Sequence, residues 1–247
     1  MKYIVSTLTL FFLGFVNPAQ ADQPYGGTEI SVVYANQWAP ISYEEGGEIK
    51  GLLPDRMDEI LAQQMGMKVT HIPSPWGRAQ KLVERGSVDA FVTTVTPKRL
   101  QYSSASEAKV FILPFVPVVR SFDLKVKSFK DADDLSQYKD QLFCDVLGNG
   151  WADYFYKDKP VQVYTAPTIK ECLLLLRAGR VQSIIHAEPV LRKYIKELDL
   201  EKALTVLPRP SARSPKFSLM ISKKSRLDQD FLDYFDQHLA SQKEIEN

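Results

Sequence analysis

The sequence is short of the residues that bind metal ions. Its 247 residues include three histidines, His71, His186 and His238, and two cysteines. None of the histidines stands at metal-ligand spacing from another, whereas zinc sites combine several such ligands at close spacing. We therefore expect no metal site and no cofactor.

A net charge of one sign is also lacking. Lys and Arg number 31, and Asp and Glu number 30. Proteins that bind nucleic acid or acidic membrane surfaces through their overall field carry a clear basic excess. We expect no nucleic acid partner, and any recognition of charge must be local.

Long apolar runs are absent beyond the N-terminus. The densest apolar patch, Val110 to Val119, is interrupted by Pro114 and Pro117 and is too short for a membrane-spanning helix. The content of hydrophobic residues, 45%, and of charged residues, 25%, is ordinary for a globular protein with one large core or two modest ones. A membrane-spanning receptor is disfavoured.

The N-terminus has the pattern of a secretory signal peptide. Lys2 precedes the apolar stretch from Ile4 to Val16, and small residues stand at Ala19 and Ala21. The stretch is too short to span a bilayer, and the small residues are typical of a cleavage site. We expect residues 1–21 to be removed and the mature protein to be a periplasmic monomer.

Because the chain is expected to be secreted, Cys144 and Cys172 would reach an oxidising compartment. A disulfide between them is permitted there. Both lie in apolar segments, so two buried free thiols are the alternative. The sequence favours the disulfide.

Strand and helix patterns alternate along most of the chain. Expected strands are 30–34, 69–72, 90–95, 142–147, 161–164, 183–186 and 217–222, and expected helices are 54–65, 76–85, 150–156, 168–178, 189–198 and 227–239. The segment from Trp38 to Glu48 is expected to be a loop with a turn at Gly46-Gly47. Such alternation predicts α/β units with parallel sheets.

The alternation is interrupted at 110–119 and again at 206–210. Extended segments of this kind suit passages of the chain between two lobes. We predict a two-lobed α/β fold with two hinge crossings. The first lobe is expected to comprise residues 22–117 and 208–247, and the second lobe residues 118–207.

Several short motifs occur in a characteristic order. They are Trp38-Ala39-Pro40-Ile41-Ser42-Tyr43, Gly51-Leu52-Leu53-Pro54-Asp55, Trp76, Gly86-Ser87-Val88-Asp89-Ala90 and Thr96-Pro97-Lys98-Arg99, followed by weaker matches at Gly148-Asn149-Gly150 and Gly179-Arg180-Val181. In these motifs the sequence resembles family 3 of the periplasmic solute-binding proteins, which serve polar amino acid ABC transporters. The resemblance implies a type II periplasmic-binding-protein-like fold. It also implies capture of a small polar solute with a carboxylate by lobe closure, and a membrane permease as partner.

The resemblance also implies a binding site. Arg99 would grip the carboxylate of the solute, assisted by Thr94 and Thr96, because a guanidinium pairs with both carboxylate oxygens. Trp38 and Tyr43 would form an aromatic wall. The motif tryptophan Trp76 is expected nearby.

Two further residues are candidates for binding an anion. Arg78, close to Trp76 at the start of an expected helix, is a possible second cation, with a surface charge as the alternative. Asn149 stands between an expected strand and helix, where free backbone amides favour anions. His186 is expected to end a buried strand rather than to titrate.

The sequence departs from the family pattern in two places. The segment from Asp89 to Arg99 is two residues shorter than the family's usual one, so the loop before Arg99 must be reshaped. Ala187 stands where amino acid binders have an Asp for the ligand's ammonium, and Glu188 follows it. Because a buried ammonium without a partner is costly, either Glu188 takes that role or the solute is not an ordinary α-amino acid.

Two alternative functions share this scaffold. A dehydratase-like enzyme would need an acid or base near the ligand, and Glu188 and His186 are the candidates in the second lobe. A soluble sensory protein would present the solute to a membrane receptor instead of a permease. We expect binding without catalysis.

Overall fold

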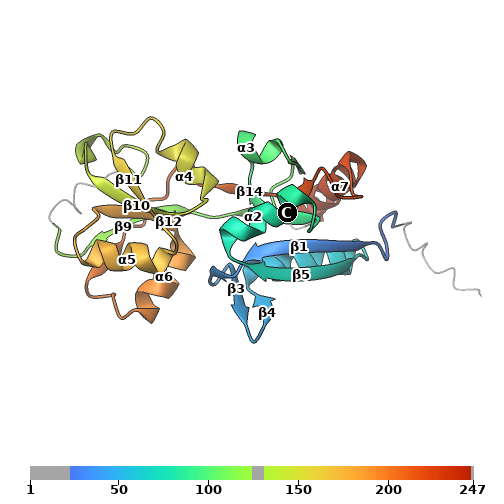
Figure 1. Ribbon diagram of the computed structural model, residues 1–247, viewed down its shortest axis with the longest axis horizontal. Coiled ribbons are helices and arrows are strands. Elements are labelled where there is room, and N and C mark those ends of the chain that lie inside the picture. Colours follow the sequence, from blue (N-terminus) through green and yellow to red (C-terminus); the bar gives the residue numbers. More distant parts are fainter. Residues whose placement is uncertain (1–22, 124–130, 246–247) are drawn as a thin grey trace, which may run out of the picture.

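The computed structural model describes residues 23–123 and 131–245, and its strands form two larger sheets and one small one. Figure 1 shows each larger sheet with its own helices, as two lobes at opposite ends of the molecule. The predicted two-lobed α/β fold is thereby confirmed. The expected signal peptide, residues 1–21, lies outside the described residues.

The first lobe is built on a sheet of six strands in the order β5-β1-β6-β14-β7, with β8 paired to β14. These are β1 (Glu29–Ala35), β5 (Lys68–Ser74), β6 (Ala90–Thr94), β7 (Ser103–Ala105), β8 (Phe111–Ile112) and β14 (Lys216–Ser222). Strand β1 pairs in parallel with β5 and β6, as the alternation predicts, whereas β14 runs antiparallel to β6. The chain thus returns to this sheet near its C-terminal end.

Five helical segments belong to the first lobe. They are α1 (Leu52–Met57), its π-helical continuation η1 (Asp58–Gln64), α2 (Trp76–Arg85), α3 (Pro97–Leu100) and α7 (Gln229–Ile245). Helix α2 has the predicted limits because Gly86, with φ at 76°, adopts the left-handed conformation that ends a helix. None of the helices in the described ranges is long and apolar enough to cross a bilayer.

The second lobe is built on a sheet of five strands in the order β11-β10-β12-β9-β13. These are β9 (Phe115–Arg120), β10 (Leu142–Val146), β11 (Gln162–Ala166), β12 (Ser183–Ala187) and β13 (Leu204–Val206). Among the described residues its helices are α4 (Gly150–Phe155), α5 (Ile169–Arg177) and α6 (Glu188–Glu197), with a 3-10 turn, η3 (Ser136–Tyr138). The predicted strands and helices of this lobe are all present, with small shifts at their ends.

The segment predicted as a loop, 38–48, forms most of a three-stranded antiparallel sheet instead. Its strands are β2 (Gln37–Trp38), β3 (Ser42–Glu45) and β4 (Glu48–Lys50). Gly46 and Gly47 have φ values of 64° and 85°, which suit the two-residue turn of a hairpin. The loop prediction was wrong because these strands are short, mostly polar and exposed, so no apolar alternation marks them.

The chain passes between the two sheets twice, from β8 to β9 and from β13 to β14. The two passages are bonded to each other. Leu113 N–H donates to Pro215 O over 3.4 Å, and Ser211 N–H donates to Phe115 O over 2.9 Å. Strand β9 begins at Phe115, somewhat before the expected limit of the second lobe, and the lobe limits themselves stay a prediction.

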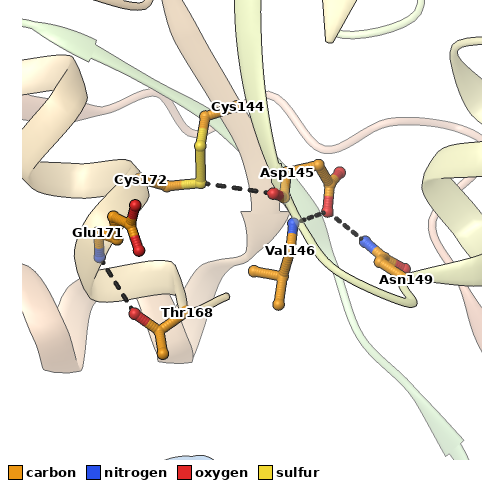
Figure 2. Close-up of a disulfide and its surroundings, with 7 residues drawn as sticks. All are labelled: Cys144, Asp145, Val146, Asn149, Thr168, Glu171 and Cys172. Atoms are coloured by element: carbon orange, nitrogen blue, oxygen red, sulfur yellow. Dashed lines mark hydrogen bonds between the residues drawn. A yellow bond between two sulfur atoms is a disulfide. The ribbon is translucent and has the colours of Figure 1, made fainter. Parts of the chain in front are cut away.

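Cys144 on β10 and Cys172 on α5 form a disulfide (Figure 2). The predicted bond is confirmed, and the alternative of two free thiols is wrong. Both residues are fully buried, so the bond joins helix to sheet inside the core of the second lobe.

Candidate functional site

A cavity of about 280 Å³ lies between the lobes. Arg99, Trp38 and Trp76 line it from the first lobe, and Asn149 and His186 line it from the second. Much of its wall comes from the carboxyl ends of strands β1, β6, β10 and β12, where ligands of open α/β sheets usually bind. The cavity therefore lies between the two sheets, at the edge of each sheet where ligands of such sheets usually bind.

Arg99 is held by the short helix α3. Thr96 Oγ1 accepts from Arg99 N–H over 3.2 Å and caps the helix, and Pro97 begins it. The Arg99 residue is only 3% exposed. Burial lowers the pKa of its guanidinium from the usual value, while Tyr102 and Asp153 act to raise it. Arg99 is a buried cation at the cavity wall.

Every nitrogen of the Arg99 guanidinium donates within the protein. Nη1 donates to the backbone oxygen and to Oγ1 of Thr94, over 2.8 and 2.7 Å. Nε and Nη2 both donate to Gln80 Oε1, over 3.2 and 3.1 Å, and Nη2 also donates to Gly148 O over 3.1 Å. All these acceptors are neutral, and none of the ion pairs among the described residues involves Arg99. A cation so buried favours an anion as neighbour.

The turn after β10 brings the two lobes into contact at this point. Trp76 Nε1–H donates to Gly148 O over 2.9 Å, and the Arg99 guanidinium lies 5.4 Å from the Trp76 ring centroid. A Cβ at Gly148, where φ is 79°, would stand 2.8 Å from Gln80 Nε2, and a Cβ at Gly150 would stand 2.8 Å from Arg99 Nη1. The lobes pack closely at this turn because both positions lack side chains.

Asn149 is held in the same turn by a buried carboxylate, as Figure 2 shows. Asp145 Oδ1 accepts from Asn149 Nδ2 over 2.8 Å and from Val146 N–H over 2.6 Å. Asn149 Oδ1 accepts from Trp151 N–H and caps α4. Burial raises the pKa of Asp145 to about 7. Asp145 thus positions the turn but is not part of the cavity wall.

His186 is the next-to-last residue of β12, one residue before the strand ends, and it also lines the cavity, where the sequence placed it only for the enzyme alternative. Its ring stacks on Phe115 with centroids 5.0 Å apart and meets the edge of Trp38 at 6.3 Å. Burial lowers the pKa of His186 to about 4, so the ring is neutral at neutral pH.

Five of the predicted binding residues come together in the wall of the cavity. They are Arg99, Thr94, Trp38, Trp76 and Asn149. Gln80 and the carbonyl of Gly148 were missed, although both bond to Arg99. No local pattern marks them, because their role arises only where the lobes meet.

The other four predicted residues lie outside this wall. Tyr43 lines a neighbouring cavity of about 750 Å³ that shares Asn36 and Gln37 with the first. Thr96 acts as the cap of α3, and Arg78 is exposed on α2. Glu188 Oε1 forms an ion pair with Arg192 Nη2 over 2.6 Å along α6. Its carboxylate therefore has a partner outside the cavity.

The described residues contain no group of three or more His, Cys, Asp or Glu side chains that could hold a metal ion. Within the same part of the chain, no Asp or Glu side chain lines the cavity. What the arrangement offers chemically is one buried guanidinium, neutral hydrogen-bonding groups and aromatic surface.

Comparison with protein families gives one match. The model of the bacterial extracellular solute-binding proteins, family 3, matches residues 30–244. Comparison with curated protein sequences gives no significant match.

Solved structures share the fold at low sequence identity. A histidine kinase sensor domain with similarity to periplasmic binding proteins has a TM-score of 0.71 at 18% identity, with 90% of this chain and 92% of that one covered. An ancestral arginine-binding protein bound to arginine has a TM-score of 0.68 at 19% identity, with coverages of 87% and 92%. A protein from a study of glutathione import in Streptococcus mutans has a TM-score of 0.68 at 15% identity, with coverages of 88% and 90%.

Proposed function

The chain belongs to the bacterial extracellular solute-binding proteins of family 3, and we propose that it captures a small solute with a carboxylate group between its two lobes. One observation carries the proposal. Arg99 is buried in the wall of the interlobe cavity and has only neutral acceptors. A carboxylate supplies the missing negative charge and forms charge-assisted hydrogen bonds, which are roughly twice as strong as neutral ones.

The bound carboxylate takes the place of neutral acceptors on Arg99. Gln80 Oε1 accepts from both Nε and Nη2, and Gly148 O also accepts from Nη2. These two nitrogens form an edge of the guanidinium that can bind both oxygens of a carboxylate. The Gln80 side chain is partly exposed, so it can move aside when the solute enters. Thr94, Trp38, Trp76 and Asn149 complete the proposed site.

Contacts that cross the cavity support the proposal of lobe closure. Gly148 O of the second lobe accepts from Trp76 and Arg99 of the first. On the other side of the cleft, Ala39 N–H donates to the Tyr194 hydroxyl over 3.2 Å. Separation of the lobes breaks these bonds and admits the solute, and the two crossings between the sheets serve as the hinge.

The proposal includes no chemical step. Glu188, a candidate acid or base, is paired with Arg192 outside the cavity wall. His186 lies in the wall but is neutral and packed between aromatic rings. The proposed role is delivery from the periplasm to the membrane permease of an ABC transporter, by a monomer secreted through a cleaved signal peptide.

A thermal-shift screen of the mature protein tests this function. Carboxylates, their amides and uncharged solutes are compared, since a ligand that binds only the folded state raises the melting temperature. We expect stabilisation by carboxylates and its loss in Arg99→Met. Arg85→Met removes an exposed arginine of α2 and is the matched control. Equal stabilisation of wild type and Arg99→Met by a carboxylate would contradict the proposal.

A further inference from the structure

The charge of the cavity wall is unbalanced. Among the described residues that line it, Arg99 is the single charged side chain at neutral pH, because none of the others is Asp, Glu, Lys or Arg and the buried ring of His186 is neutral. A ligand with one carboxylate neutralises this site. A zwitterionic amino acid would also bury an ammonium group, which needs an acceptor of opposite charge.

Three acidic residues of the second lobe lie outside the wall. Asp153, which acts to raise the pKa of Arg99, is exposed on α4. Glu188 is paired with Arg192, and Ala187 before it is fully buried in β12. Asp145 is not a wall residue, and its side chain is bonded to Asn149 and to the backbone of Val146 (Figure 2). None of these groups faces the cavity as a free carboxylate.

The neighbouring cavity does not supply the missing charge either. Its carboxylates are those of Glu44, Glu45 and Glu197. Glu45 pairs with Lys50 over 2.7 Å, Glu197 pairs with Lys170, and Glu44 Oε2 accepts from Asn36 Nδ2 over 3.1 Å. Two of these carboxylates are neutralised by lysines, and the third is bonded to an amide.

Aromatic rings form part of the wall, beside aliphatic and neutral polar side chains. Tyr34, Trp38, Trp76, Phe115 and Phe217 line the cavity together with His186. The Trp38 and Phe217 rings are 5.6 Å apart, so they form one continuous surface. Burial of apolar ligand surface on such a wall stabilises the complex by about 25 cal/mol per Å². The volume of about 280 Å³ is at the lower end for small-molecule sites, which limits the ligand to about one ring or a short branched chain.

We propose that the site selects monocarboxylates with an aromatic or branched apolar body and without an ammonium group. This inference rests on the proposed function, in which Arg99 holds the carboxylate. One cation then matches one carboxylate, the aromatic rings bind the body, and the absence of an acid in the wall discriminates against amino acids with the same carbon skeleton.

Isothermal titration calorimetry with matched ligand pairs tests the inference. One pair is 3-phenylpropanoate and phenylalanine, and the other is 4-methylpentanoate and leucine, which differ only by the ammonium group. We expect each acid to bind about tenfold or more tightly than its amino acid, a difference of about 1.4 kcal/mol or more. If an amino acid binds as well as its partner acid, the inference is wrong. The proposal that Arg99 binds the carboxylate is then unaffected. If no carboxylate of either pair, nor of the wider thermal-shift panel, binds, the proposed function fails as well.

Thr168 allows a second test within the wall. It lines the cavity and caps α5, where its Oγ1 accepts from Glu171 N–H over 3.3 Å. Asp is as good a helix cap as Thr, so Thr168→Asp adds a carboxylate to the cavity without loss of the cap. We expect the affinity ratio of phenylalanine to 3-phenylpropanoate to rise about tenfold in Thr168→Asp. Thr168→Asn has the same shape without the charge and should leave the ratio unchanged. An unchanged ratio in Thr168→Asp would overturn the inference.

Discussion

Arg99 Nη2 of the first lobe donates to the backbone oxygen of Gly148 in the second lobe over 3.1 Å. The cation proposed to bind the solute therefore also bonds across the cleft. Since a carboxylate competes with neutral acceptors for the same guanidinium, anion binding and lobe contact are coupled at one side chain. Variants that change one of these bonds at a time separate the two roles.

A change at Gln80 tests whether its oxygen stands where the solute carboxylate binds. Gln80→Glu keeps the shape of the side chain that bonds to Arg99 Nε and Nη2 but adds a negative charge. The internal carboxylate should compete with the ligand and weaken its affinity about tenfold or more, as measured by calorimetry. Gln80→Ala, which leaves this edge open, should retain carboxylate binding. Wild-type affinity in Gln80→Glu would show that the ligand does not use this edge.

Trp76→Phe tests the contact between the lobes. The variant keeps an aromatic ring but loses the hydrogen bond from Nε1 to Gly148 O. Because such a bond contributes about 0.5–1.5 kcal/mol, we expect a larger radius of gyration in the ligand-free variant by small-angle X-ray scattering. A bound carboxylate should restore the smaller radius.

The control for this variant is Tyr154→Phe, which removes a hydroxyl from an exposed ring of α4. It should scatter as wild type. If Trp76→Phe also scatters as wild type without ligand, the Trp76 bond does not help to hold the lobes together.

Removal of the disulfide should destabilise the second lobe. The double variant Cys144→Ser and Cys172→Ser opens the link between β10 and α5, and the loss of a native disulfide costs about 2–5 kcal/mol. Urea unfolding followed by circular dichroism measures the change. Wild type in a reducing buffer should approach the stability of the variant, and equal stability of all three samples would contradict the prediction.

Two buried groups give the stability opposite dependences on pH. The pKa of Asp145 is raised by burial from 3.8 to about 7, so its contribution to stability falls as the pH rises between these values. The pKa of His186 is lowered by burial from 6.5 to about 4, so its contribution falls as the pH falls between these values. Each slope is at most about 1.4 kcal/mol per pH unit, and the two oppose each other between about pH 4 and 6.5.

Asp145→Asn separates these effects because its side-chain oxygen can still accept from Asn149 and Val146. Without the titration of Asp145, the His186 effect is unopposed. We expect the free energy of unfolding of the variant to fall more steeply than that of wild type from pH 6.5 to 4.5. Above pH 7 the variant should be the more stable protein. Parallel pH profiles for the two proteins would contradict the assignment.

The sequence predicted what depends on local pattern. Helix α2 was expected at its observed limits because Gly86 ends it, and Arg99 was expected at the ligand pocket from the Thr96-Pro97-Lys98-Arg99 motif. The side chain of Gln80 and the carbonyl of Gly148 were not expected to bond to Arg99. Their proximity comes from the packing of two lobes whose residues are far apart in the chain, and periodicity carries no signal for that.

Calorimetry with a carboxylate and with the corresponding amide, in wild type and in Arg99→Met, tests whether Arg99 binds the charge of the solute. The amide keeps the apolar body and removes only the charge that Arg99 is proposed to hold. We expect wild type to prefer 3-phenylpropanoate over 3-phenylpropanamide by about tenfold or more, and Arg99→Met to bind both with similar affinity. The same preference in both proteins would contradict this expectation, because the carboxylate would then be recognised without Arg99.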